Sequence, residues 1–437
     1  MSKRVVILGG GISGYGSAIL AKKMGFEVFL SDMGTLKREY CALLEEWGVE
    51  YEQGTHTRAK ILSADEIIKS PGIPDKAELV REASSKGIPI ISEIEFAGRY
   101  LGGARTILIS GSNGKTTTTS LIYKILNEAG YRVALGGNIG ESFAYSVAMG
   151  GYDWYVLEIS SFQLDGMYDF RADVSVLMNI TPDHLDRYEY KFQNYVDSKM
   201  RLVQNQRAED IFIYSADDPT IAAELKARCL NMTMLPFSKE NISAEALEIG
   251  GMSMPLSSLK IKGLHNCYNA MAAMLAARAA GVEWSDIAAS VASFNPVEHR
   301  LEPAGEIDGV EYVNDSKATN VDSVWYALES LKKRGVWIAG GTDKGNDYEP
   351  LKGFAREKIH TLVCMGLDNR ALEEAFSGII PTIISTSSLE EAMAAARAAA
   401  RPGEVVLLSP ACASFDLFKS YINRGELFKE WVAKNRD

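Results

Sequence analysis

The 437-residue sequence contains no uninterrupted apolar run that approaches the roughly 18 residues of a membrane-spanning helix. An apolar run follows the basic residues at the start of the sequence, but it breaks at Gly9 and is too short for a signal peptide. The five cysteines include no Cys-x-x-Cys pair, which is typical of unpaired thiols in a reducing compartment. We therefore expect a cytoplasmic protein with no membrane partner.

The sequence also contains fewer basic than acidic residues. The sequence has 46 Lys and Arg against 57 Asp and Glu, a net charge of −11, which disfavours general binding of nucleic acid. There is no low-complexity tract, and a composition of 46% hydrophobic and 24% charged residues is typical of an ordered globular protein. At roughly 100–200 residues per domain, the length predicts two to four domains, and we expect three.

A phosphate-binding turn is predicted in residues 106–126, TILISGSNGKTTTTSLIYKIL, where an apolar strand leads into an amphipathic helix. A turn built on Gly111 and Gly114 lets backbone N–H groups point at an anion, and a helix starting near Lys115 adds the positive end of its dipole. Lys115 would reach the β- and γ-phosphates, and the hydroxyl of Thr116 or Thr117 would meet Mg²⁺. The general P-loop pattern has glycine where this sequence has Ile109. The alternative is a strand-turn-helix corner with an incidental lysine.

A second glycine turn, Gly9-x-Gly11-x-x-Gly14, follows the first apolar strand, and Asp32 ends the next one. This is the dinucleotide fingerprint, and it predicts a nicotinamide or flavin site. What it requires physically is a turn that admits a diphosphate and a carboxylate for a ribose hydroxyl, so a UDP-sugar or a purely structural corner fits too. Residues 70–72, Ser-Pro-Gly, form a fixed turn at another strand end of this sheet. The first domain should end between residues 91 and 95.

Polar residues follow several apolar strands of the predicted second domain. Asn138 follows one strand, and Glu158 ends another, where a carboxylate can hold Mg²⁺ or form a surface salt bridge. A third strand is followed by Asn179, Asp183, His184 and Asp186. Such strand ends form the ligand crevice of an open α/β sheet. Lys199 lies in the next predicted helix, where a solvated lysine is the alternative.

Residues that suit a nucleotide continue toward the C-terminus. A helix beginning near residue 263 carries His265, Asn266 and Asn269 in its first turns, and two asparagines three residues apart share a face that could hold adenine or ribose. A third α/β domain follows, with polar residues after three strands: Asp315, Ser316, Lys317, Thr319 and Asn320 in one turn, Lys344 in another, and Ser414 at the start of a helix. Asp315 or Ser316 could instead cap a helix.

Eight segments of the sequence, which contain most of these residues, together resemble the Mur ligases. They are GSNGKTT, LEISSFQL, NITPDHLDRY, HNCYNAMAA, EHRLE, NDSKATN, GGTDKG and SPACASFDLFKSYINRGELF. The resemblance covers the whole chain in order. The last three segments resemble the members that add D-glutamate, rather than those that add L-alanine, a diamino acid or a dipeptide. Tyr421 stands where the family pattern has phenylalanine.

The resemblance implies an α/β fold of three domains. Residues 1–93 would form a Rossmann-like domain that binds a UDP substrate, residues 94–297 a central P-loop ATPase domain, and residues 298–437 a C-terminal Rossmann-like domain that binds the amino acid. The implied reaction uses ATP to join D-glutamate to UDP-N-acetylmuramoyl-L-alanine through an acyl phosphate, in peptidoglycan precursor synthesis. ATP and two Mg²⁺ ions are the implied cofactors, and we expect a monomer.

The resemblance also implies roles for individual residues. Lys115, His184 and a carbamylated Lys199 would be catalytic. ATP would be bound by Gly111, Ser112, Asn113, Gly114, Lys115, Thr116, Thr117, Asn266, Asn269, Arg300 and Asp315. The UDP substrate would be bound by Ser13, Gly14, Tyr15, Asp32, Met33, Ser70, Pro71, Gly72, Asn138, Ser160, Gln163 and His184. D-Glutamate would be bound by Lys317, Thr319, Lys344, Ser414, Phe415 and Tyr421. Thr116 and Glu158 would hold one metal ion, and His184 and Lys199 the other.

Other classes of function stay open at this point. Within the ligases, another Mur-type enzyme or a folylpolyglutamate synthase is possible, although the first domain favours a UDP substrate. The N-terminal glycines alone suggest an NAD-dependent dehydrogenase, but such an enzyme leaves the Gly-Lys-Thr sequence, Glu158 and His184 unexplained. A non-catalytic scaffold would bind ATP without turnover.

Overall fold

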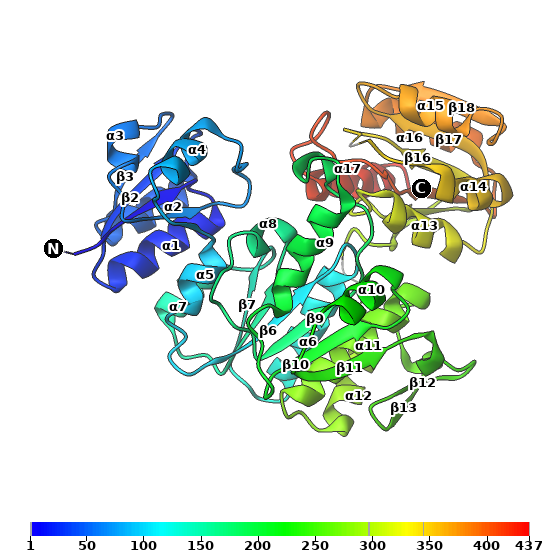
Figure 1. Cartoon of the computed structure of the whole chain (residues 1–437). Coiled ribbons are helices and arrows are strands. Elements are labelled where there is room, and N and C mark those ends of the chain that lie inside the picture. Colours follow the sequence, from blue (N-terminus) through cyan, green and yellow to red (C-terminus); the bar gives the residue numbers. More distant parts are fainter. Residues whose placement is uncertain (1, 296–297, 344, 437) are drawn as a thin grey trace. The chain divides into compact units, whose positions relative to one another are not determined.

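The computed structural model describes residues 2–295, 298–343 and 345–436, and it contains three sheets that are parallel or nearly so (Figure 1). The chain separates into two compact units. One comprises Met1–Pro182 with Arg187–Phe294, and the other comprises Asp183–Asp186 with Asn295–Asp437. The three sheets, one in each predicted domain, confirm the predicted α/β fold of three domains; the first two sheets belong to the first compact unit and the third sheet to the second. The exact domain boundaries stay a prediction.

The first sheet has the strand order β3-β2-β1-β4-β5, and each of its pairs is parallel. This is the order of a Rossmann fold, whose ligand crevice lies where the order reverses, between β1 and β4. Both faces of β1 are covered by helices, and its burial is nearly continuous. The elements are β1 (Arg4–Leu8), α1 (Ile12–Lys23), β2 (Glu27–Asp32), α2 (Arg38–Glu46), β3 (Glu50–Gln53), α3 (Arg58–Ile61), β4 (Glu66–Lys69), α4 (Glu78–Ser85), β5 (Ile90–Ile91) and α5 (Glu93–Gly98).

The second sheet is also parallel and has the order β11-β10-β9-β6-β8-β7. Strand β6, which leads into the predicted phosphate turn, lies between β8 and β9, so the polar residues after those two strands flank the turn. Its elements are β6 (Arg105–Ser110), α6 (Lys115–Glu128), β7 (Val133–Gly137), α7 (Phe143–Met149), β8 (Trp154–Glu158), α8 (Ser161–Leu164), β9 (Val174–Leu177), α9 (Phe192–Met200), β10 (Ile211–Ser215), α10 (Pro219–Ala227), β11 (Thr233–Phe237), the hairpin β12 (Ala246–Ile249) and β13 (Met252–Pro255), α11 (Leu264–Ala279) and α12 (Trp284–Ser293).

The third sheet has the order β14-β15-β19-β16-β17-β18, in which only the pairing of the edge strand β14 with β15 is antiparallel among the described residues. Strands β15, β19 and β16 are neighbours, and the three predicted glutamate-binding turns follow them. Its elements are β14 (Glu302–Ile307), β15 (Val310–Asn314), α13 (Val321–Ser330), β16 (Gly335–Ala339), α14 (Lys352–Lys358), β17 (Ile359–Met365), α15 (Arg370–Phe376), β18 (Thr382–Thr386), α16 (Leu389–Ala399), β19 (Val405–Leu408) and α17 (Tyr421–Lys434).

Two local predictions in the third sheet are wrong. Ser414 does not start a helix, because α17 begins at Tyr421, where the Ser420 side chain accepts a hydrogen bond from the Asn423 N–H. Neither Asp315 nor Ser316 caps α13, because the Asn320 side chain accepts from the Ser323 N–H at its start. None of the helices in the described ranges combines the length and the apolar composition that crossing a bilayer requires.

Candidate functional site

The turn between β6 and α6 depends on two glycines in left-handed conformations, Gly111 at φ 143° and Gly114 at φ 85°. A Cβ on Gly114 would lie 2.4 Å from Oδ1 of Asn269, so no larger residue fits there without a shift. Helix α6 begins at Lys115, as predicted, and its N-terminus faces the turn. The local geometry is that of an anion site at a helix N-terminus.

Lys115 folds back over this turn. Its Nζ donates to the carbonyl oxygens of Gly111 at 2.6 Å and Ser112 at 2.9 Å, which keeps a positive charge at the turn. Asn179, at the end of β9, braces the turn from the other side: its carbonyl accepts from the Ser112 N–H and its Oδ1 from the Asn113 N–H. The sequence placed Asn179 at a strand end, but this bracing contact was not predicted.

Thr116, Glu158 and Asn138 meet beside the turn. The hydroxyl of Thr116 donates to Oε2 of Glu158 at 2.6 Å, and the Asn138 amide donates to Oε1 at 2.8 Å. Glu158 is only 2% exposed. The neighbouring Thr117 hydroxyl is buried and has no hydrogen-bond partner within the described part of the chain. This cluster therefore offers a carboxylate and hydroxyl oxygens at the start of α6.

These oxygens fit a magnesium ion that is completed by a nucleotide. Mg²⁺ in nucleotide sites is held by one or two protein oxygens, substrate phosphates and water. Thr116 and Glu158 supply such oxygens next to the anion site. Among the described residues, no group of three or more His, Cys, Asp or Glu could enclose a metal ion alone.

Lys199 belongs to the same site. Its side chain is 1% exposed, and its Nζ donates to the Gly111 carbonyl at 2.8 Å and lies 3.3 Å from the Ser110 hydroxyl. The alternative of a solvated helix lysine is therefore wrong, because packing of α9 against the turn buries the amine. Two lysine amines, those of Lys115 and Lys199, contact one carbonyl oxygen.

The asparagines of α11 are buried next to α6. The Asn269 amide donates to Oδ1 of Asn266 at 3.0 Å, and Asn269 Oδ1 lies 3.4 Å from the Thr118 hydroxyl. The structure thus brings Asn269 to the phosphate turn, as its predicted role in ATP binding requires. Asn266 also donates to the carbonyl of Lys262, which lies just before the start of α11.

The glycine turn of the first sheet lies at the switch point between β1 and β4. Asp32 accepts hydrogen bonds from the Gly10 N–H at 2.5 Å and the Gly34 N–H at 2.6 Å, so its carboxylate shapes the turn. A Cβ on Gly14 would lie 1.9 Å from the Gly9 carbonyl oxygen. The hydroxyls of Ser13 and Ser70, from opposite sides of the switch point, are 3.4 Å apart. These predicted UDP contacts therefore converge.

Other predicted UDP contacts have structural partners of their own. The Tyr15 ring is buried and stacks on Tyr40, and its hydroxyl donates to Glu141. Ser160 and Gln163 form a capping box at the start of α8. Met33 is 60% exposed. Pro71 and Gly72 form the turn after β4.

In the second unit, Asp315 lies buried at the end of β15. It accepts from the Ser409 hydroxyl at 2.8 Å and from the Leu301 N–H at 3.2 Å. Burial raises the pKa of Asp315 to about 7, and the nearby Arg300 opposes that rise. The Nε of Arg300 is buried without a hydrogen-bond partner in the described residues. The predicted ATP contacts Arg300 and Asp315 are thus neighbours.

The predicted glutamate contacts lie on adjacent strand ends. Lys317 follows β15, and its Nζ lies 5.2 Å from the centre of the Tyr421 ring. Ser414 follows β19 and is 2% exposed, whereas Phe415 is 76% exposed. Thr319 belongs to the same turn as Lys317, to whose carbonyl its N–H donates. Lys344 lies outside the described residues.

His184 belongs to the second unit, with the segment Asp183–Asp186. It has a left-handed backbone at φ 53°, and its N–H donates to the side chain of Asp183 at 2.9 Å. The Asn320 amide donates to the same carboxylate at 3.2 Å, which attaches this segment to the turn that carries Lys317. Lys199, its predicted partner on the second metal ion, belongs to the first unit.

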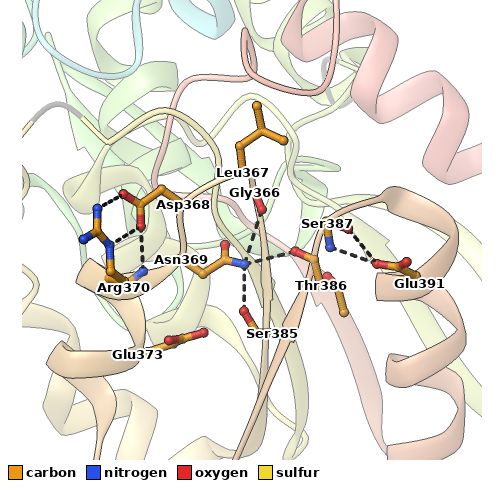
Figure 2. A pocket seen from close by; sticks show the side chains of 10 residues that line it. All are labelled: Gly366, Leu367, Asp368, Asn369, Arg370, Glu373, Ser385, Thr386, Ser387 and Glu391. Carbon is orange, nitrogen blue, oxygen red and sulfur yellow. Dashed lines mark hydrogen bonds and ion pairs between the residues drawn. The ribbon is translucent and has the colours of Figure 1, made fainter.

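A further cavity of about 540 Å³ lies at the carboxyl ends of β17 and β18 (Figure 2). Its polar groups stabilise their own turns: Asp368 pairs with Arg370, Ser387 donates to Glu391, and the Asn369 amide donates to Ser385. The Leu367 N–H donates to Asp416, the residue after Phe415. The cavity thus borders the loop after β19.

Comparison with known proteins matches three family models in order along the chain. Residues 4–79 match the MurD N-terminal domain, residues 109–277 the Mur ligase middle domain, and residues 299–412 the Mur ligase glutamate ligase domain. The UDP-N-acetylmuramoylalanine–D-glutamate ligase of Bacteroides fragilis is 51% identical over 98% of this chain and 99% of its own length. The enzyme of the same name from Bacteroides thetaiotaomicron is 49% identical over the same shares.

Among solved structures, UDP-N-acetylmuramate–alanine ligase from Thermotoga maritima shares the fold. Its TM-score is 0.65 at 16% identity, and the match covers the whole of both chains. At this identity the likeness supports the fold alone. The three family models together cover both glycine turns and the third sheet. An NAD-dependent dehydrogenase would explain only the first glycine turn. The chain therefore belongs to the Mur ligase family, with an N-terminal domain of the MurD type.

Proposed function

We propose that the protein is an ATP-dependent ligase that adds D-glutamate to UDP-N-acetylmuramoyl-L-alanine in peptidoglycan synthesis. The observation that carries this proposal is the 51% identity, over 98% of the chain, to a ligase of that name. The match of residues 4–79 to the MurD N-terminal domain favours this enzyme over other Mur ligases and over folylpolyglutamate synthase.

The reaction has two steps. The terminal carboxylate of the L-alanyl group attacks the γ-phosphorus of ATP, ADP leaves, and an acyl phosphate forms. The amine of D-glutamate then attacks the acyl carbon, the phosphate leaves with the bonding electrons, and the nitrogen loses a proton. The turn N–H groups and Lys115 stabilise the charge on the transferred phosphoryl group, in a step that depends on positioning and electrostatics.

The metal ions would assist this charge stabilisation. We propose two Mg²⁺ ions, one held by Thr116 and Glu158 and the other by His184 and a carbamylated Lys199, and each would neutralise phosphate oxygens. The pairing of Thr116 with Glu158 supports the first ion. We further propose that the enzyme acts as a monomer in the cytoplasm. The absence of a disulfide among the described cysteines suits a reducing compartment.

D-Glutamate would be held by Lys317, Thr319, Lys344, Ser414, Phe415 and Tyr421. Strands β15, β16 and β19 are adjacent, so their turns can hold the two carboxylates and the amine of one amino acid from three directions. Such three-point contact discriminates between enantiomers.

A coupled assay of phosphate release tests the proposal. With ATP, Mg²⁺ and UDP-N-acetylmuramoyl-L-alanine, we expect phosphate release with D-glutamate and at least a hundredfold less with L-glutamate, L-alanine or a diamino acid. A pterin acceptor should be inactive. Equal rates with both enantiomers of glutamate would contradict the proposed substrate.

A further inference from the structure

Arg424, in the first turn of α17, is a charged side chain with 0% exposure. Arginine is almost never fully buried unless it is paired with an opposite charge. Within the described residues, Arg424 forms no ion pair with a carboxylate, and its hydrogen-bond acceptors are neutral oxygens. Its burial therefore needs another explanation.

The guanidinium distributes its five N–H donors over three residues. Nε donates to the Ser316 hydroxyl at 3.0 Å, and Nη2 donates to the Ser316 carbonyl at 2.9 Å. Nη1 contacts the Gly340 carbonyl at 3.4 Å, and both Nη atoms contact the Cys412 carbonyl at 3.4–3.5 Å. The five contacts match the fork of donors that arginine presents.

The three acceptors lie in three turns that follow adjacent strands. Ser316 follows β15, Gly340 follows β16 and Cys412 follows β19, in a sheet where β19 lies between the other two strands. Lys317 is the next residue after Ser316, and Ser414 is two residues after Cys412. The turn that begins at Gly340 leads toward Lys344. One guanidinium thus joins the backbones of the turns that carry the proposed glutamate contacts.

These turns have little regular structure of their own to fix them. Between β19 and α17 the chain runs from Ser409 to Ser420 without a helix, and Ala411 has a left-handed backbone at φ 61°. Burial lowers the pKa of Arg424 to about 10, so its guanidinium remains charged at neutral pH. Hydrogen bonds from a charged donor are stronger than neutral ones, which suits a single side chain that holds three turns.

We propose that Arg424 is a positioning residue for D-glutamate, which fixes the turns after β15, β16 and β19 in the geometry that binds the amino acid. The inference rests on the proposed function, since the ligand of these turns is assigned there. Arg424 acts through the backbones of these turns, so its replacement should weaken binding of the amino acid more than binding of the nucleotide.

The test uses Arg424→Met, which keeps the approximate volume but removes the charge and the donors, and Arg424→Lys, which keeps the charge with a different donor geometry. Val432→Ala is the control, because Val432 is equally buried in α17 but contributes to the hydrophobic core of this sheet. We expect the KM for D-glutamate to rise at least tenfold more than the KM for ATP in Arg424→Met. Arg424→Lys should show an intermediate rise, and Val432→Ala should lower only the melting temperature.

Equal changes in the two KM values, or a KM for D-glutamate that matches the Val432→Ala control, would overturn the inference. If Arg424→Met does not fold, Ser316→Ala removes the acceptor of Nε and should raise the KM for D-glutamate about threefold; an unchanged KM would again count against the inference. A wild-type protein that releases no phosphate with D-glutamate contradicts the proposed function itself, whereas an active wild type with unaffected variants contradicts only the role of Arg424.

Discussion

The hydroxyl of Thr116 lies 2.6 Å from Oε2 of Glu158, and this contact joins the start of α6 to the end of β8. The two strands that lead to these residues, β6 and β8, are paired in parallel, with Ile109 opposite Glu158. The sheet register therefore places the carboxylate beside the phosphate turn. A hard cation bound there would contact both side chains and the phosphates of a nucleotide.

This relationship predicts how Glu158→Gln behaves. Glutamine keeps an oxygen that can accept from Thr116 but loses the negative charge, so the Mg²⁺ concentration for half-maximal activity should rise at least tenfold. The measurement is a Mg²⁺ titration of phosphate release at fixed ATP. Glu128→Gln, near the other end of α6, is the matched control and should leave the titration unchanged. An unaltered Mg²⁺ requirement in Glu158→Gln would remove Glu158 from the metal site.

Lys115→Ala should abolish turnover. The substitution removes the charge that is held over the turn, and losing a cation at a transferring phosphoryl group costs several kcal/mol of transition-state stabilisation, on the order of 10²–10⁴-fold in kcat. Lys124→Ala on the same helix removes an exposed ion pair with Glu128 and should be nearly silent. Near-normal activity of Lys115→Ala at saturating ATP would reject the phosphate site.

The raised pKa of the buried Asp315 predicts that the stability of the protein depends on pH. Its pKa is raised from the ordinary value of about 4 to about 7 by burial, so the folded state favours the neutral form. The neutral Asp315 side chain therefore contributes to the free energy of unfolding. This contribution is fully present below about pH 4 and is lost as the pH rises through about 7. Between pH 5 and pH 8 the wild type should therefore lose several degrees of melting temperature relative to Asp315→Asn, measured without nucleotide.

The control for this effect is Asp368→Asn. The Arg370 side chain lowers the pKa of Asp368 to about 2, so that carboxylate is ionised throughout the same range. The difference in melting temperature between wild type and Asp368→Asn should accordingly stay constant from pH 5 to pH 8. A constant difference for Asp315→Asn as well would show that Asp315 titrates near its ordinary pKa.

Much of this fold can be predicted from the sequence because its signals are local. Gly111 and Gly114 lie between an apolar strand and an amphipathic helix, and Glu158 ends another apolar strand, so parallel pairing brings them to one sheet edge. The start of α17 could not be predicted in this way. Residues 409–420 are held by contacts from distant parts of the chain, among them the Ala318 carbonyl, Thr342 and Leu367, and only tertiary structure supplies those.

The burial of Lys199 was likewise unpredictable from local sequence, because it depends on the packing of α9 against the turn.

The surroundings of Lys199 support the proposed carbamate. The amines of Lys115 and Lys199 both donate to the Gly111 carbonyl, at 2.6 Å and 2.8 Å, so a partly buried and a fully buried ammonium group would lie close together. Like charges at such a distance disfavour each other, and CO₂ reacts with the neutral form of an amine. A carbamate at Lys199 would replace this repulsion with attraction and supply oxygens for a cation.

Lys199→Ala should accordingly be nearly inactive, and a short carboxylate such as acetate should restore part of its activity by occupying the vacated anionic position. Ethylammonium, which mimics the unmodified amine, should not. Lys191→Ala, at the exposed start of the same helix, is the matched control and should remain active without additives. The measurement is phosphate release at increasing acetate or ethylammonium concentration. Rescue by ethylammonium alone, or full activity of Lys199→Ala, would show that Lys199 acts as an unmodified lysine or has no part in the reaction.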